Sequence, residues 1–305
     1  MEGVVIKSTG SWYKVYTHNR EIIPCQLRGA FRVKGIKTTN PVAVGDRVDY
    51  EMVSGDQTGV IFGIKPRENY IIRKATKLSK LSHIIAANID EAFLVVTLAE
   101  PRTSTGFIDR FLITSEAYHI PANIIFNKSD IYDSGLKENL ASLSEIYQDA
   151  GYPCLQVSAL RGDNIEQLKT RIQGRISLFA GHSGVGKSAL INILQPGIDL
   201  KTRPISVVHQ KGIHTTTFAE MIPLDIGGFI IDTPGIKEFG LYDLDRETLA
   251  ERYPEMRALM HDCKYYNCTH IHEPGCAVKE AVKEGKIHEL RYNNYLAISH
   301  SDELN

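Results

Sequence analysis

The sequence predicts a multidomain chain with a small all-β barrel first, an α/β domain in the centre and a mainly helical module last. Short β-rich segments separated by glycines occupy residues 3–65, and apolar strands alternate with helical patterns from about residue 85. After about Tyr242 the composition turns polar and includes a group of cysteines and histidines. A chain of 305 residues is long enough for two ordinary domains or three small ones. We therefore place the domains at residues 1–68, 69–241 and 242–305.

The composition is that of a globular protein, with 43% apolar and 23% charged residues. No apolar run approaches the roughly 20 residues of a membrane helix, and the N-terminus lacks the pattern of a secretion signal. Five cysteines, three of them between Cys263 and Cys276, argue against a disulfide framework. We therefore expect a cytoplasmic protein without a membrane partner, and nothing in the sequence demands more than a monomer.

The N-terminal segment is predicted to form a small closed barrel. Its β-rich stretches include Val4–Ile6, Trp12–Tyr16 and Val48–Val53, and residues 44–48 predict a tight turn into the last of them. The oligonucleotide-binding (OB) barrel is one form that fits this length and spacing, although other small barrels fit as well.

The charge of this segment favours a polyanionic partner. Residues 1–80 carry 14 Lys/Arg against 7 Asp/Glu, an excess of +7, whereas the whole chain has a net charge of −1. Such an excess favours binding of a polyanion, and a merely solvated basic surface is the alternative. Trp12, Tyr13, Tyr16 and Phe31 have rings that can stack on bases, but core packing explains most aromatics in so small a fold.

The central segment alternates between predicted strands and helices, a pattern typical of a mostly parallel sheet covered on both faces. The strands are predicted at 92–98, 123–126, 154–157, 176–180 and 229–231. The helices are predicted at 107–115, at 137–150, from a cap at Asp163 or Asn164 to Ile172, and at 189–194.

A phosphate-binding loop follows the strand at 176–180. The run Gly181-His182-Ser183-Gly184-Val185-Gly186-Lys187-Ser188 matches the glycine-rich loop in full, and an apolar segment that can continue as a helix begins at Ala189. Backbone N–H groups of such a loop wrap phosphates at the positive end of the helix. Lys187 would reach the β- and γ-phosphates, and Ser188 would ligate magnesium.

A second magnesium group is predicted at Asp232-Thr233-Pro234-Gly235, after the strand at 229–231. An aspartate that leaves a buried strand near a phosphate loop can hold Mg²⁺, usually through water. The amide of Gly235 can then meet the γ-phosphate, because glycine permits close approach. Alone, the tetrapeptide would more often be an Asp-capped turn.

The base is predicted to be guanine. Asn127-Lys128-Ser129-Asp130 ends the strand at 123–126, and the Asp130 carboxylate can accept hydrogen bonds from N1–H and the exocyclic amine of guanine. Adenine offers neither donor and would leave a buried carboxylate unpaired. Asn127 would brace the loops, the Lys128 stem would lie over the base, and Ser158-Ala159-Leu160 can offer an amide to the guanine O6. The expected ligands are therefore GTP or GDP with Mg²⁺.

These motifs resemble those of the GTPase superfamily in an unusual order, because Asn127–Asp130 and Ser158–Leu160 precede Gly181–Ser188 and Asp232–Gly235. The central domain is thus predicted to be a circularly permuted P-loop GTPase. With a basic barrel before it and a cysteine/histidine module after it, the whole chain resembles the family of ribosome small-subunit-dependent GTPase A (RsgA, also YjeQ or YloQ). The segment Gly212–Thr217 adds to the resemblance. The resemblance implies a bacterial factor that binds the small ribosomal subunit and its rRNA late in maturation and hydrolyses GTP there.

The first switch is expected at His214–Thr217, between the phosphate loop and Asp232. Either Thr216 or Thr217 would complete the magnesium coordination. Ile236 stands where a water-orienting glutamine is expected and cannot orient water. Our hypothesis is that His214 does so once a partner orders the switch, and a mobile, solvent-facing histidine is the alternative.

A zinc site is predicted at Cys263, Cys268, His270 and Cys276, because three thiolates and one imidazole suit closed tetrahedral coordination. Four protein ligands leave no place for water, so one structural Zn²⁺ is expected. His261 and His272 compete for the histidine role, and the spacing in the resembling family favours His270. Residues 277–299 are predicted to form a helix whose charged residues, Arg291 among them, serve as a packing or docking surface or as a solvated face.

The leading interpretation is an enzyme, a ribosome-associated GTPase. The alternative is an RNA-binding module in which guanine nucleotide is mainly a structural ligand. A phosphoryl-transfer kinase is disfavoured by Asn127–Asp130 and the switch-like segment.

Overall fold

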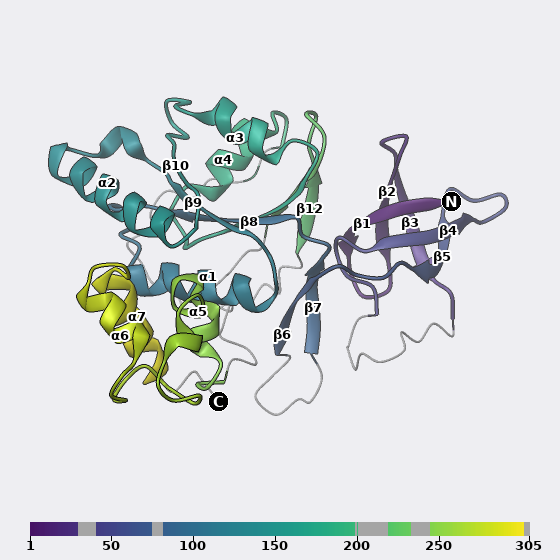
Figure 1. Ribbon diagram of the computed structural model, residues 1–305. Helices are drawn as coiled ribbons and strands as arrows, with labels where there is room; N and C mark the ends of the chain where they lie inside the picture. Colours follow the sequence, from purple (N-terminus) through teal and green to yellow (C-terminus); the bar gives the residue numbers. More distant parts are fainter. Residues whose placement is uncertain (30–40, 75–81, 199, 201–218, 233–244, 302–305) are drawn as a thin grey trace, which may run out of the picture. The chain divides into compact units, whose positions relative to one another are not determined.

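The structure, a computed structural model, describes residues 1–29, 41–74, 82–198, 200, 219–232 and 245–301 (Figure 1). The chain divides into two compact units. The first comprises Met1–Ala92, Glu166–Ala180 and Ser188–Ile236, and the second comprises Phe93–Ile165, Gly181–Lys187 and Lys237–Asn305.

Five strands of the first unit close a barrel, which confirms the predicted OB-type barrel. They are β1 (Glu2–Ser8), β2 (Tyr13–Thr17), β3 (Ile22–Leu27), β4 (Arg47–Met52) and β5 (Gly59–Ile64). The pairings β1–β2, β2–β3, β3–β5, β5–β4 and β4–β1 complete the ring, and only β3–β5 is parallel. Side chains from all five strands, together with Val42 from the segment before β4, fill the interior; the strand residues are Val5, Tyr13, Val15, Cys25, Val48, Tyr50 and Ile61.

Two barrel strands were not predicted from the sequence. Pro24 lies inside β3, and β5 begins with Gly59 and contains Gly63. Proline and glycine are both depleted in strands, so these segments have a weak local preference for the structure they adopt. Closure of the barrel overrides that preference.

The remaining elements of the first unit are two helices and five strands. They are β6 (Tyr70–Lys74), β7 (Ser82–Ala87), α3 (Ile165–Ile172), β11 (Ile176–Ala180), α4 (Lys187–Leu194), β12 (Glu220–Pro223) and β13 (Phe229–Asp232). The sheet is only partly parallel: β11 and β13 run parallel, whereas β12 runs antiparallel to β13 and meets β1 where Lys7 opposes Glu220.

The second unit begins with three strands and two long helices. They are β8 (Glu91–Val96), α1 (Thr105–Ala117), β9 (Ala122–Phe126), α2 (Ser134–Asp149) and β10 (Cys154–Gln156). Every residue of β8 and β9 is buried, as expected of strands covered on both faces. The pairing of β9 with β10 is parallel, which agrees with the prediction for this part of the chain.

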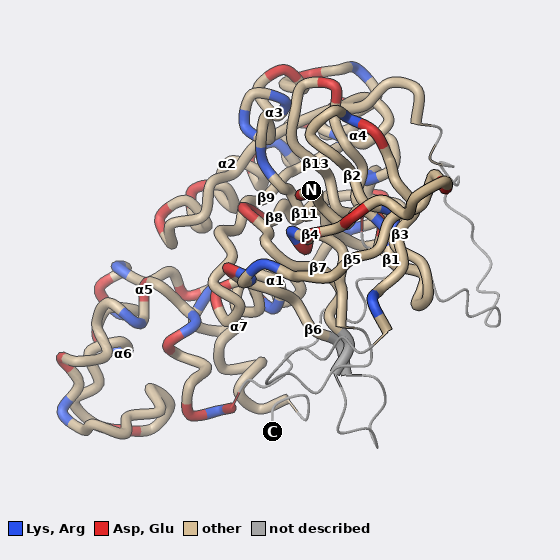
Figure 2. The backbone as a smooth tube through the Cα atoms, turned by 90° about the vertical axis from the view of Figure 1, so that its right-hand side faces the viewer, with Lys and Arg blue, Asp and Glu red and all other residues tan. Residues whose placement is uncertain are grey.

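The C-terminal part of the second unit is helical, as predicted. Besides two short 3₁₀ turns, it contains α5 (Pro254–Arg257), α6 (Ala277–Lys283) and α7 (Glu289–Ser299). The single helix expected over 277–299 is two helices, because Gly285 between them has a φ of 74°, which no α-helix accommodates. Basic and acidic residues alternate along α6 (Figure 2). In the described part of the chain, no helix is long and apolar enough to cross a membrane.

Candidate functional site

The phosphate-binding motif forms a tight turn that depends on glycine. Gly181, Gly184 and Gly186 all have positive φ, at 143°, 87° and 95°. A Cβ at Gly181 would collide with the carbonyl oxygen of Val95, and a Cβ at Gly186 would collide with the side-chain amide of Asn127. Gly181 and Gly186 therefore exclude other residues on steric as well as conformational grounds, and Gly184 disfavours them through its positive φ.

Lys187 is folded back on its own loop. Its Nζ donates to the carbonyl oxygens of Gly181 at 2.5 Å and of His182 at 3.0 Å. Helix α4 begins at Lys187, so Ser188 and Ala189 lie in its first turn. The arrangement therefore combines a lysine, a serine hydroxyl and a helix N-terminus, the groups that bind nucleotide phosphates and their metal ion.

Asn127 connects the end of β9 to two loops. Its Nδ2 donates to the carbonyl of Val185 at 2.8 Å, and its Oδ1 accepts from the backbone N–H of Ala159 at 3.1 Å. The side chain is 1% exposed. One buried amide therefore fixes the phosphate loop and the Ser158–Ala159 loop against the same strand end.

Asp130 and Ser158 lie together beside this amide. The Ser158 hydroxyl donates to Oδ1 of Asp130 at 2.5 Å and accepts from the backbone N–H of Arg161 at 3.0 Å. Lys128 adopts the left-handed conformation, with φ at 62°, and its ammonium donates to the carbonyl of Glu100. The candidate base-reading loop is therefore held by hydrogen bonds from Ser158 and Lys128.

Tyr132 is a supporting residue that the sequence analysis missed. Its hydroxyl donates to the carbonyl of Asn127 at 2.6 Å and accepts from the N–H of Leu98 at 2.9 Å. The side chain is 4% exposed, and burial raises its pKa, so the hydroxyl remains a neutral donor. A tyrosine two residues after Asp130 belongs to no motif, and only its burial reveals this role.

Asp232 ends β13 in the first unit. It lies in register with Phe179 of the parallel strand β11, one residue before β11 ends. Parallel strands present their carboxyl ends at one edge of a sheet, which is where ligands bind in open α/β folds. The other predicted residues of this group, His214, Thr216, Thr217 and Gly235, lie outside the described residues.

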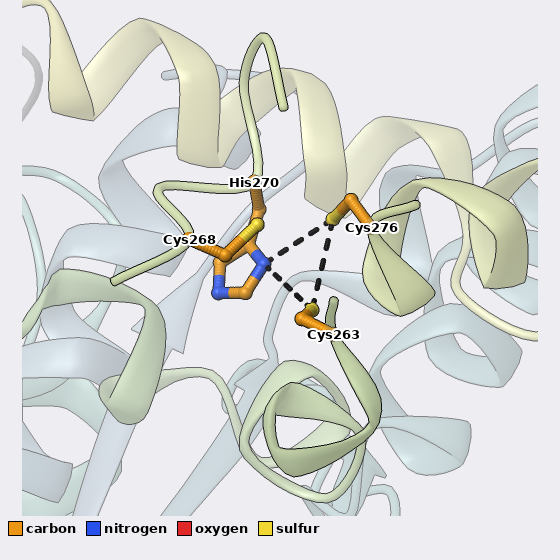
Figure 3. A group of neighbouring side chains, drawn as sticks. All are labelled: Cys263, Cys268, His270 and Cys276. Carbon is orange, nitrogen blue, oxygen red and sulfur yellow. Dashed lines mark hydrogen bonds between the residues drawn. The ribbon is translucent and has the colours of Figure 1, made fainter. Parts of the chain in front are cut away.

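The second unit also holds a candidate metal centre (Figure 3). The ligand atoms of Cys263, Cys268, His270 and Cys276 all lie within 4.8 Å of one another. Nδ1 of His270 is 3.3 Å from Sγ of Cys276 and 3.6 Å from Sγ of Cys263, and these two sulfurs are 3.9 Å apart. Ligands about 2.0–2.3 Å from a tetrahedral zinc ion are separated by about 3.3–3.8 Å, so the cluster fits this metal.

The surroundings of the cluster hold its ligands in place. Tyr292 donates to the carbonyl of His270 at 2.7 Å, and the Sγ of Cys276 accepts from the N–H of Lys279 at 3.4 Å. Burial lowers the pKa of His270, which keeps the imidazole neutral and able to coordinate a metal. Neither His261 nor His272 belongs to the group, which removes the ambiguity left by the sequence.

Comparisons with known proteins cover almost the whole chain. The family model described as RsgA GTPase matches residues 64–242, and the one described as RsgA N-terminal domain matches residues 2–61. A Bacteroides fragilis (strain YCH46) protein named small ribosomal subunit biogenesis GTPase RsgA is 52% identical over 303 residues, which cover 99% of this chain and 97% of the relative. A protein of the same name from Christiangramia forsetii is 51% identical over 307 residues, covering 100% of this chain and 98% of the relative.

Two solved structures share the fold. The crystal structure of YjeQ from Thermotoga maritima matches with a TM-score of 0.79 and 36% identity, covering 98% of this chain and 97% of that one. The crystal structure of YloQ, described as a circularly permuted GTPase, matches with a TM-score of 0.76 and 31% identity, covering 98% of this chain and 93% of that one. The central domain is accordingly a circularly permuted GTPase domain, as the motif order predicted.

Proposed function

We propose, since this chain belongs to the RsgA GTPase family and is therefore a GTP-hydrolysing enzyme, that it binds the small ribosomal subunit and couples hydrolysis to late maturation of that subunit. The curated relatives carry this role in their name, and they align with the chain from end to end. The proposal places the protein in the cytoplasm as a monomer, with the domains at 1–68, 69–241 and 242–305.

The observation that carries the nucleotide assignment is the convergence of two loops on Asn127. The side chain of this residue bonds both to the phosphate loop, at Val185, and to the Ser158–Ala159 loop. Asp130, held by Ser158, then reads the guanine edge, the Ala159 amide meets O6 and the Lys128 stem covers the base. Residues 181–189 surround the phosphates, and Lys187 leaves its two carbonyl partners for the β- and γ-phosphates.

Magnesium and the attacking water complete the proposed reaction site. We assign Mg²⁺ to Ser188 and Asp232, together with Thr216 or Thr217, and the γ-phosphate contact to the amide of Gly235. His214 is our candidate for orienting water, since Ile236 has no hydrogen-bonding side chain. Hydrolysis is then slow until a partner places the segment 214–217.

The rRNA contact is assigned to the N-terminal barrel. Residues 1–80 carry 14 basic and 7 acidic residues, and within the barrel segment three of the basic ones, at 32, 34 and 37, lie in a stretch without any acidic residue. Such a separation of charge within the sequence favours phosphate contacts from this stretch.

The metal of the C-terminal module is proposed to be one structural Zn²⁺. Cys263, Cys268, His270 and Cys276 supply three sulfurs and one nitrogen, and four protein ligands leave no position for a reacting water. When bound, the ion would cross-link the loop from 263 to 276, and it would take no part in GTP hydrolysis.

The decisive experiment measures GTP turnover with increasing amounts of small ribosomal subunits, on the wild type and on Lys187→Ala. Stimulation of the wild type and loss of turnover in Lys187→Ala are expected. Tight association with subunits that leaves turnover unchanged would instead favour the alternative, an RNA-binding module with a structural nucleotide.

A further inference from the structure

An aromatic stack joins the phosphate loop to helix α1. The rings of Phe107 and His182 have centroids 3.7 Å apart and an interplanar angle of 28°. Phe107 lies in the first turn of α1, where its N–H donates to the capping Ser104 side chain at 3.3 Å. Both rings are half-buried, so the stack lies at the surface of the loop and outside the hydrophobic core.

The stack acts on the part of the loop that holds Lys187. The carbonyl of His182 is one of the two oxygens that accept from Lys187 Nζ. Gly181, immediately before it, lies so close to Val95 that an added Cβ would collide with the Val95 carbonyl oxygen. The backbone at Gly181 thus lies against Val95 on one side, and the ring of Phe107 restrains the neighbouring residue through the imidazole.

Helix α1 is a rigid platform for this ring. Asp109, one residue beyond Ile108 on α1, is fully buried and accepts from Arg291 and, at 2.7 Å, from Nδ2 of Asn294. Both donors belong to α7, so the C-terminal helical region fixes the position of α1 along its first turns. The ring of Phe107 therefore keeps its position if the loop 181–188 moves.

We propose that Phe107 is a positioning residue for nucleotide binding, which holds the phosphate loop in its binding conformation through the imidazole of His182. The inference rests on the proposed assignment of Gly181–Ser188 to the phosphates. Phe107 itself touches neither nucleotide nor metal in this scheme.

The test replaces the flat ring while keeping an apolar side chain of similar reach. Phe107→Leu is expected to raise the Kd for GTP and GDP about 2- to 12-fold, the range set by an aromatic pair. KM for GTP should rise in parallel, with kcat at saturation within about twofold of the wild type, because the stack restrains the free loop before the chemical step. Phe107→Tyr, which keeps the flat ring, should restore the wild-type Kd.

A double-variant cycle with His182→Ala shows whether the ring acts through the imidazole. Phe107→Leu combined with His182→Ala should bind no more weakly than His182→Ala alone, whereas independent effects would multiply. Phe111→Leu, the same substitution one turn further along α1 at a buried site, should lower thermal stability and leave the Kd unchanged.

Four results would overturn the inference: an unchanged Kd in Phe107→Leu, no rescue by Phe107→Tyr, multiplicative effects in the double variant, or an equal loss of affinity in Phe111→Leu. Lys187→Ala separates these from failure of the underlying assignment. If Lys187→Ala binds GTP and GDP normally, the phosphate-loop assignment itself is wrong. If it loses binding while Phe107→Leu does not, only the role of Phe107 is wrong.

Discussion

At the scale of single residues, base recognition in the proposed site depends on one carboxylate. Oδ1 of Asp130 accepts a hydrogen bond from the Ser158 hydroxyl. The turn that contains Asp130 is held by hydrogen bonds of Asn127 and Tyr132. An aspartate can accept both donors of the guanine edge, and an asparagine can accept only one while offering an N–H₂ group of its own. The residue type, more than its exact position, therefore sets which purine fits.

Asp130→Asn is expected to exchange guanine for xanthine specificity. Xanthine presents one donor and one acceptor where guanine presents two donors, which matches an asparagine side chain. Loss of a hydrogen bond to a charged group costs about 1.5–3 kcal/mol, so the Kd for GTP should rise roughly 10- to 150-fold while that for xanthosine triphosphate falls. Competition binding of the two nucleotides to wild type and variant provides the measurement, and equal weakening for both would argue that Asp130 only supports the fold.

At the scale of elements, the sequence predicted those whose own pattern is strong. Strand β11 occupies the predicted residues 176–180, α1 extends two residues beyond its predicted core at each end, and α2 begins three residues earlier and ends one residue earlier than predicted. Strand β12, with only four residues, has no pattern of its own, and its antiparallel pairing depends on β13 and β1. The candidate nucleotide motifs can be recognised because their chemistry fixes residue type and spacing. Tyr132 acts through two hydrogen bonds of its buried hydroxyl, and the proposed role of Phe107 depends on a ring contact; no local sequence pattern encodes either.

Arg291 is the clearest case of a residue that the sequence could not place. It belongs to the charged residues of the segment 277–299, yet it is 1% exposed, and its guanidinium binds Asp109 and Glu255 and lies 4.6 Å from the ring centre of Tyr253. Burial opposes its charge, but the two carboxylates hold its pKa well above the usual value. Charged residues in a polar helical segment indicate a solvated face. Only the tertiary contacts show that Arg291 points inward.

Arg291→Met is therefore expected to destabilise the second unit. The variant leaves the buried Asp109 carboxylate without its ion pair, which typically costs about 3–5 kcal/mol. Urea unfolding monitored by circular dichroism measures the change. Arg257→Met removes the half-exposed ion pair with Glu116 and serves as a matched control, with an expected change under about 1 kcal/mol. Similar losses in the two variants would show that burial of the pair is energetically unimportant.

Removal of the proposed zinc should act on another part of the C-terminal helical region, the N-terminus of α6. The cluster connects the chain before α6 to the N-terminus of that helix, where Cys276 is the cap. We expect one zinc per chain by atomic absorption, its loss in Cys276→Ser, and a lower melting temperature after chelation. Cys154→Ser, outside the cluster, should keep the metal. A metal content unaffected by Cys276→Ser would exclude this site.

At the scale of the whole molecule, the barrel is tied to the chain that follows it by a turn and one asparagine. Nδ2 of Asn88 donates to the carbonyl of Gly45 at 3.0 Å, and its Oδ1 accepts from the N–H of Glu68 at 2.9 Å. The backbone adds a bond from Ala87 to Val44, and Gly45 lies directly against the Ala87 carbonyl. These contacts join the turn into β4 to the residues after β7, and both belong to the first compact unit.

Asn88→Gly tests how strongly this connection stabilises the barrel. Asn88 has a φ of 54°, so glycine removes both side-chain hydrogen bonds without adding backbone strain. Two polar backbone groups then lose their partners, at about 1–3 kcal/mol each where they are buried, and the free energy of unfolding should fall by about 2–4 kcal/mol. In Asn88→Ala the free energy of unfolding should fall by about 1 kcal/mol more, because alanine resists positive φ.

Asn164→Gly is the control. Its φ is 58°, and its side-chain hydrogen bond to the Gln156 carbonyl is exposed, so the free energy of unfolding should change by less than about 1 kcal/mol. If Asn88→Gly is no less stable than this control, these side-chain bonds add little and the barrel is held mainly by its own closed ring of strands.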